Sequence, residues 1–148
     1  MKILKQGLML LVSFFVFLGL TACSVEREET YEKKYTDSLV RVMIRHRSNQ
    51  MISEEFWADN FNLNIEDDSE FEYIKKEIVD PKKGISGYTT DVTRTKENGL
   101  MIHTKIIYQD LDVEALNKAN GEKKTIGELA DYSDHIKNLK KEGYKRVK

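Results

Sequence analysis

Apolar and polar residues alternate across Ser38–Arg47, with two valines and an isoleucine on one face. A period of two predicts a strand that is buried on one side. Ser48–Gln50 supplies a turn, and Met51–Ile65 continues with extended character. Its pattern is less regular, so a helix over Ser53–Phe61 is the competing interpretation.

A second pair of strands surrounds Glu97–Gly99. Ile85–Lys96 is rich in Thr, Val and Tyr, and Leu100–Asp110 alternates apolar with polar residues. Asn-Gly between two such runs is the strongest short-range hairpin signal. We therefore predict an antiparallel hairpin here.

Helical spacing of apolar residues occurs in three segments. Glu70–Val79 follows the capping residues Asp67–Ser69 and stops at Asp80-Pro81. Val113–Ala119 ends at Asn120-Gly121, and Glu122–Gly127 is expected to be a loop.

The third helix carries Tyr132, Ile136 and Leu139 on one side and runs through Glu142 to a stop at Gly143. Tyr144 and Val147 then suit a short terminal strand. Hairpins combined with short helices predict an α+β fold with two layers, in which an antiparallel sheet carries its helices on one face.

The first residues follow a different pattern. Lys2 and Lys5 precede a stretch, Gly7–Leu20, that is apolar apart from one serine. Fourteen helical residues rise roughly 21 Å, less than the hydrocarbon thickness of about 30 Å. The stretch therefore suits the hydrophobic region of a signal peptide better than a permanent membrane span.

The end of this stretch has the form of a lipobox, in the residues Leu20, Thr21, Ala22 and Cys23. A thiol is needed to accept diacylglycerol, and small neighbours expose the bond that a peptidase cuts. We predict removal of residues 1–22 by cleavage between Ala22 and Cys23, with Cys23 as the lipid-carrying N-terminus. Two acyl chains suffice for stable attachment, whereas one holds a protein only marginally.

Residues 23–35 are predicted to be the lipidated cysteine and a charged tether, because Ser24–Tyr35 shows no apolar periodicity. Residues 36–148 then form a single domain. Without Lys2 and Lys5, 22 of the 24 basic residues remain against 25 acidic residues, a net charge of −3. A nucleic-acid-binding protein normally has a strong basic excess, so we expect no nucleic-acid partner.

The order of these features resembles that of the YehR-like bacterial lipoproteins. The resemblance rests on the lipobox, on a charged start to the mature chain, and on these segments in the same order: the strand pair across Tyr35–Phe61, Asp67–Gly87 with its Lys82–Gly87 run, the strand Ile102–Asp110 leading into Asp112–Leu116, and the ending Ile136–Val147. It implies a two-layer α+β domain that is lipid-anchored outside the cytoplasmic membrane. It implies no activity, since the family brings no catalytic motif to carry over.

The histidines His46, His103 and His135 have no second histidine at metal-ligand spacing. A metal or enzyme site would have to be assembled across strands, from His46 or His103 with Glu54, Glu55 or Asp110. That is the alternative hypothesis. Adjacent acids such as Glu54 and Glu55 are otherwise interpreted as solvated charges.

The sequence motifs of nucleophilic catalysis and phosphate binding are missing. The sequence has no Gly-x-Ser-x-Gly elbow, no cysteine after Cys23 and no glycine-rich phosphate loop, so we expect no catalysis and no cofactor. Arg41, Arg45 and Arg47 form a positive stripe that suits either a solvent-exposed sheet face or anionic headgroups. The aromatic group of Trp57, Phe56 and Phe61 is expected to pack in the core, with ligand contact as the alternative.

The sequence thus predicts a non-catalytic, lipid-anchored binding or accessory module on the extracytoplasmic face of the cell membrane. Its partners are the membrane, through Cys23, and a small-molecule or protein ligand. Abundant Lys and Asn with one Pro favours a Gram-positive host, and in a Gram-negative host the location would be the outer membrane. The released peptide Val16–Ala22 also has the look of a pheromone, which is a separate hypothesis.

Overall fold

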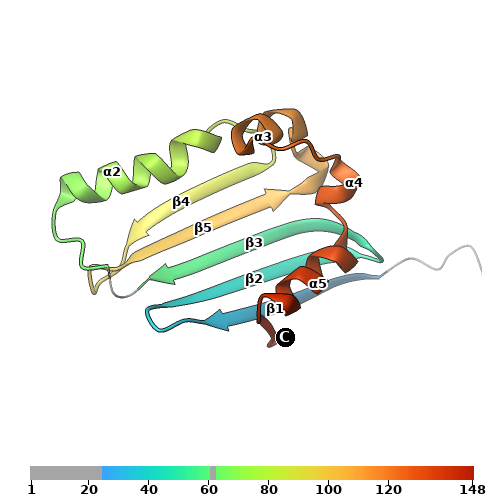
Figure 1. Cartoon of the computed structure of the whole chain (residues 1–148), viewed down its shortest axis with the longest axis horizontal. Coiled ribbons are helices and arrows are strands. Elements are labelled where there is room, and N and C mark those ends of the chain that lie inside the picture. The colour runs from blue at the N-terminus through green and yellow to red at the C-terminus, as the bar shows by residue number, and fades with distance from the viewer. Residues whose placement is uncertain (1–24, 61–62) are drawn as a thin grey trace, which may run out of the picture.

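The computed structural model describes residues 25–60 and 63–148. The predicted signal peptide and lipobox lie outside the described residues. Six described strands form one sheet: β1 (Glu26–Lys34), β2 (Ser38–Arg47), β3 (Gln50–Asn60), β4 (Tyr88–Arg94), β5 (Leu100–Ile107) and β6 (Lys145–Arg146). Their order is β4-β5-β3-β2-β1-β6, and every neighbouring pair is antiparallel (Figure 1).

Four described α-helices accompany the sheet: α2 (Asp68–Val79), α3 (Val113–Asn120), α4 (Ile126–Leu129) and α5 (Tyr132–Lys141). Short 3-10 turns follow α2 at Asp80–Lys82 and β5 at Tyr108–Asp110. In Figure 1 α2 lies beside β4 and α5 lies over β1 and β2, at opposite edges of the sheet. No helix in the described ranges is both long and apolar enough to span a bilayer.

All helices pack on the same face of the sheet, which we call the helix face; the other is the open face. Two buried clusters show this. One surrounds Ile44 and Met51 under α3, α4 and α5, and the other surrounds Val92 and Leu100 under α2. Because Ile102 and Ile106 of β5 pack against different clusters but share one side of the strand, both clusters lie on one face. The predicted two-layer α+β architecture is confirmed.

The prediction of a charged tether is wrong from Glu26 to Lys34, because these residues form β1 and pair with β2 along their whole length. The hydrophobic pattern did not predict this strand, because its inward-facing positions include the charged residues Glu29 and Lys33 as well as Tyr31. Tyr31 is 2 % exposed and Glu29 is 7 % exposed. The Tyr31 hydroxyl donates to Glu29, and the other partners of Glu29, Tyr132 and Arg146, come from the C-terminal part of the chain.

Most other predicted elements are confirmed. The strand Ser38–Arg47 matches β2, and the extended interpretation of Met51–Ile65 holds over the helical one through Asn60. Asp67 caps α2 by accepting a hydrogen bond from the Ser69 amide. The predicted loop Glu122–Gly127 is partly wrong: Thr125 and Glu128 form a reciprocal capping box that begins the short helix α4.

Two residues with positive φ, Asn98 and Gly87, lie beyond the two ends of β4. Asn98 has a φ of 57° in the β4–β5 turn, as the Asn-Gly signal predicts. Gly87 has a φ of 73°, and a Cβ there would lie 2.5 Å from the amide nitrogen of Leu111. Gly87 therefore allows the segment after β5 to cross close to the start of β4, which directs the chain towards α3.

Candidate functional site

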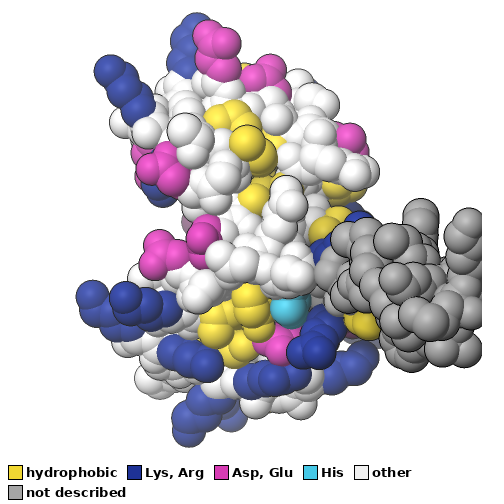
Figure 2. Space-filling view, turned by 90° about the vertical axis from the view of Figure 1, so that its right-hand side faces the viewer, with side chains coloured by type: hydrophobic (Ala, Val, Ile, Leu, Met, Phe, Trp, Pro, Cys, Tyr) yellow, Lys and Arg dark blue, Asp and Glu magenta, His cyan; other side chains and the backbone are white. Residues whose placement is uncertain are grey.

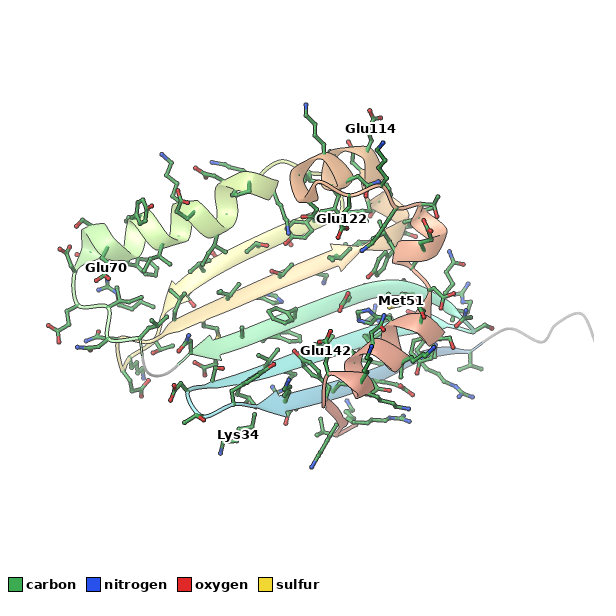
Figure 3. The ribbon with its side chains drawn as sticks, in the orientation of Figure 1. Lys34, Met51, Glu70, Glu114, Glu122 and Glu142 are labelled. Carbon is green, nitrogen blue, oxygen red and sulfur yellow. The ribbon has the colours of Figure 1, made fainter. Side chains whose placement is uncertain are left out.

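A groove of about 800 Å³ opens on the helix face, between α3, α4 and α5 and the strands below. Phe56, Thr104 and Ile106 form part of its floor, and Leu116 and Leu129 line it from the helices. Figure 3 shows Glu122 below α3, towards this groove, and Glu114 on the outer side of the same helix. The volume lies within the range of small-molecule sites, roughly 300–1,000 Å³.

Glu54 lies on the groove floor, in the middle of β3. One of its carboxylate oxygens, Oε1, is 2.9 Å from Nε2 of His135 in α5, and the other, Oε2, accepts a 3.0 Å hydrogen bond from the Tyr108 hydroxyl. The Glu54 side chain is 14 % exposed. A carboxylate placed this deep is stable only with such partners, and it remains accessible from the groove.

These contacts shift the neighbouring pKa values. Burial alone would lower the pKa of His135, but the Glu54 carboxylate outweighs it and raises that pKa above the usual value. Burial raises the pKa of the Tyr108 hydroxyl, and the Glu54 charge raises it further. Tyr108 therefore stays a neutral donor at physiological pH, and His135 carries a larger share of positive charge than a free histidine.

The rim of the groove is acidic. Its charged lining comprises the acids Glu54, Glu122, Glu128, Asp131 and Asp134, the lysines Lys82 and Lys124, and His135. Asp131 caps α5 by accepting from the Asp134 amide, and Glu122 pairs with Lys124 at 3.1 Å. Acids outnumber lysines, so the groove favours positively charged groups.

A second buried carboxylate lies outside the groove. Glu29 accepts hydrogen bonds from the Tyr31 hydroxyl at 2.7 Å and the Tyr132 hydroxyl at 2.6 Å, and its Oε1 lies 3.0 Å from Arg146. Burial alone would raise the pKa of Glu29, but these partners outweigh it and the pKa lies below its usual value. This cluster joins β1, α5 and β6.

The three histidines do not converge. His46 faces the helices, where its ring stacks on Tyr132 at 3.7 Å between centroids, and Nδ1 lies 2.9 Å from the Ser48 carbonyl oxygen. His103 lies on the open face, 3.1 Å from Glu55. The sheet therefore separates His46 from His103, and of the pairs in the alternative hypothesis His103 meets Glu55. Among the described residues no three His, Cys, Asp or Glu side chains gather at metal-binding distances.

The predicted arginine stripe lies on the open face but is neutralised by β1. Arg41 binds Glu32 at 2.6 Å, and Arg45 lies within 4 Å of both Glu26 and Glu28. Cross-strand pairing of β1 with β2 places each arginine beside an acid. A headgroup-binding role for this stripe loses its basis.

The predicted aromatic cluster is divided by the sheet. Phe56 lines the groove on the helix face, whereas Trp57 stacks on His103 on the open face at 4.9 Å. Phe61 lies outside the described residues. Consecutive strand residues point to opposite faces, so Phe56 and Trp57 do not share a core.

The interpretation of Glu54 and Glu55 as solvated charges is wrong for both. Glu55 pairs with His103 and with Lys105, at 3.0 Å, and Glu54 is the floor of the groove. The available signal was the strand period, which places Glu54 on the same face as Phe56. An acid on a core face is a candidate site residue, and its partners His135 and Tyr108 come from distant positions that no local pattern connects.

Two solved structures share this fold. The NMR structure of the Escherichia coli YehR protein aligns with a TM-score of 0.64 at 14 % identity, over 84 % of this chain and 93 % of that chain. The NMR structure of a protein from Streptococcus pneumoniae TIGR4 aligns with a TM-score of 0.55 at 15 % identity, over 83 % and 86 %. The resemblance to YehR-like proteins is thus confirmed at the level of the fold. No protein-family profile and no curated protein matches the chain.

Proposed function

We propose that this protein is a lipid-anchored, extracytoplasmic binding module without catalytic activity, which receives a small cationic ligand in the groove under α3, α4 and α5. The observation that carries the proposal is the groove of about 800 Å³ with the Glu54 carboxylate at its floor. Apolar residues at the base suit an apolar body, and the acidic lining suits an amine or guanidinium group.

The absence of catalysis is proposed from the groups around Glu54. Its partners are a tyrosine whose raised pKa keeps it protonated and a histidine that it holds directly. Within residues 25–60 and 63–148, no Ser or Thr hydroxyl hydrogen bonds to a histidine ring, so none is set up as an activated nucleophile. Binding a cationic ligand through the Glu54 carboxylate requires no such nucleophile.

The lipid anchor is proposed from the lipobox alone. The Cys23 thiol is expected to form a thioether to diacylglycerol, and the bond after Ala22 is then cut. Intact-mass measurement of protein extracted from membranes should find residues 1–22 removed and the lipid on Cys23. A Cys23→Ala chain should keep residues 1–22 and lack the lipid. An unmodified thiol on the wild-type chain would refute the anchor.

A matched pair of probes tests the groove. Phenethylamine and phenylacetate share an aromatic body and differ in the sign of their charge, and NMR titration of the ¹⁵N-labelled protein follows both. We expect phenethylamine to shift amides of β3 and α5 around the groove, and phenylacetate to leave them unchanged.

Glu54→Gln keeps the shape of the floor and removes its charge, so it should weaken phenethylamine binding by about tenfold, as expected for loss of a charge-assisted contact. Glu97→Gln, in the exposed β4–β5 turn, is the control and should bind like the wild type. Equal response to both probes, or a response of Glu54→Gln equal to that of the control, would contradict the proposed site.

A further inference from the structure

The first relevant observation is the short distance between the anchor and the fold. β1 begins at Glu26, three residues after Cys23. Three residues reach at most about 11 Å when fully extended. A lipid on Cys23 therefore holds the start of β1 close to the headgroups, and the body of the protein is near enough to contact them.

The second observation is the division of α5 into two charged flanks. The flank towards the groove carries Asp131, just before the helix, and Asp134 and His135. Lys137 and Lys140 lie on the other flank, and Lys141 follows at the end of the helix; all three are exposed. Lys137 and Lys140 line a separate shallow hollow of about 550 Å³ with Arg146 of β6. α5 therefore separates an acidic groove from a basic surface.

This basic surface continues along the edge of the sheet. Residues 132–148 contain six Lys and Arg against two acids, a net charge of +4. Residues 66–80, which include α2 at the opposite edge, contain seven acids against two lysines, a net charge of −5. Figure 2 looks at the end of the molecule where β1 starts, and Lys and Arg side chains crowd its lower rim, on the side of β1 and α5.

Few of these cations are neutralised. Arg146 is held by Glu29, and Lys148 lies 3.7 Å from Glu28. No ion pair forms in the described part of the chain at Lys137, Lys140, Lys141 or Lys145. This differs from the open-face arginines, which β1 neutralises, and leaves the edge free to bind anions.

We infer that this basic edge, made of β6 and the exposed lysines Lys137, Lys140 and Lys141 of α5, docks on the anionic phospholipid headgroups of the anchoring bilayer. The inference rests on the lipid anchor of the proposed function. The anchor brings the edge to the surface, the anionic leaflet attracts its lysines, and it repels the acidic edge that carries α2. The molecule then lies with β6 towards the membrane and α2 away from it.

The test measures this orientation on the mature lipidated protein in vesicles. The lipid occupies the thiol of Cys23, so a single added cysteine can carry a fluorescent donor. Val147→Cys reports on the basic edge and Tyr73→Cys on α2, and both side chains are more than half exposed. Energy transfer to a headgroup-linked acceptor is compared in phosphatidylcholine alone and with one quarter phosphatidylglycerol.

We expect transfer from position 147 to exceed that from position 73 by about threefold with phosphatidylglycerol, and high salt to reduce the difference. The triple change Lys137→Glu, Lys140→Glu and Lys141→Glu should abolish the difference. Lys76→Glu, Lys118→Glu and Lys123→Glu change the net charge equally, at exposed positions away from the edge, and should preserve it. Matching urea midpoints for the two variants establish that both are folded.

Equal transfer from the two positions, or a difference that survives the edge variant, overturns the inference. Edge-dependent binding to soluble poly(glycerol phosphate) with no effect on vesicles overturns it as well, in favour of an envelope polymer. A chain found by mass to carry no lipid refutes the proposed anchor instead. Sedimentation of that unlipidated chain with the same anionic vesicles then tests the docking surface separately. The inference requires that the chain bind the vesicles, that salt weaken the binding, and that the edge variant not bind.

Discussion

The helix layer stabilises the sheet in two different ways at its two edges. Under α2 the buried residues are apolar, and α2 itself contributes half-buried side chains such as Ile78 and no fully buried one. Under α5 the core is deeper, with Ile44 at 0 % exposure, yet it also contains the carboxylates of Glu29 and Glu54. One edge is packed for stability alone, and the other also holds buried charge.

This difference indicates where function resides. A buried carboxylate destabilises a fold unless hydrogen bonds and opposite charge compensate it. The region under α5 supplies compensation twice, through Tyr31, Tyr132 and Arg146 for one acid and through Tyr108 and His135 for the other. Glu54 lies at the floor of the 800 Å³ groove, whereas Glu29 lines only the shallow hollow beside Arg146, which already pairs with it. We therefore treat Glu29 as structural and Glu54 as the binding candidate.

The largest effect should come from a cavity under α5. Ile44→Ala removes a fully buried side chain and should cost about 3–5 kcal/mol of unfolding free energy. Ile78→Ala, on the half-buried face of α2, should cost about 1–2 kcal/mol because the site can relax and admit water. Urea unfolding measures both, and equal losses would remove the distinction between the two regions.

The next effect concerns the structural acid. Tyr132→Phe keeps the ring that stacks on His46 and removes one donor to Glu29, which should cost about 1–2 kcal/mol. Tyr73→Phe is the matched control on α2, where the ring is 66 % exposed and the loss should be negligible.

Unfolding at low pH should test the same hydrogen bond between Tyr132 and Glu29. The pKa of Glu29 is lowered by its partners, so its contribution is present above the ordinary carboxyl pKa and is lost as the pH falls through the folded value. Tyr132→Phe weakens that stabilisation, so its acid unfolding midpoint should lie at higher pH than that of the wild type. Coincident acid titrations, followed by circular dichroism, would contradict the role of this hydrogen bond.

A smaller effect should appear near neutral pH. The pKa of His135 is raised in the fold, so its contribution is complete below the unfolded pKa of about 6.5 and disappears as the pH rises through the folded value. Urea midpoints should therefore fall as the pH rises from about 6 to 8.5. His135→Gln and Glu54→Gln should each flatten this slope. A slope that survives both changes must come from other groups.

The smallest effect should come from the ion pair at the acidic edge. Asp68 lies 2.9 Å from Arg94, but its side chain is 95 % exposed. Asp68→Asn should therefore change the unfolding free energy by no more than about 0.5 kcal/mol. A loss as large as that of Tyr132→Phe would show that charge matters equally at both edges.

Much of the fold was predictable from local pattern. The strand Ser38–Arg47, the capped helix after Asp67 and the Asn-Gly turn are set by residues within a few positions of one another, and each is found as predicted. β1 was not, because its period is hidden by the inward acid Glu29, whose partner Tyr132 lies 103 positions away. The candidate site was missed for the same reason, since Tyr108 and His135 reach Glu54 only through the fold.

By itself, the sequence determined the elements whose signals are short-range: alternation, capping residues, turn residues, and the lipobox pattern that predicts the anchor. Tertiary structure alone decided which face each charge occupies and which partner it meets. The physical reason is that one strand position separates Glu54 in the groove from Glu55 on the open face, and only packed neighbours make a buried carboxylate tolerable. The same folding neutralised the open-face arginines and left the lysines of α5 without an ion pair among the residues that the structure describes.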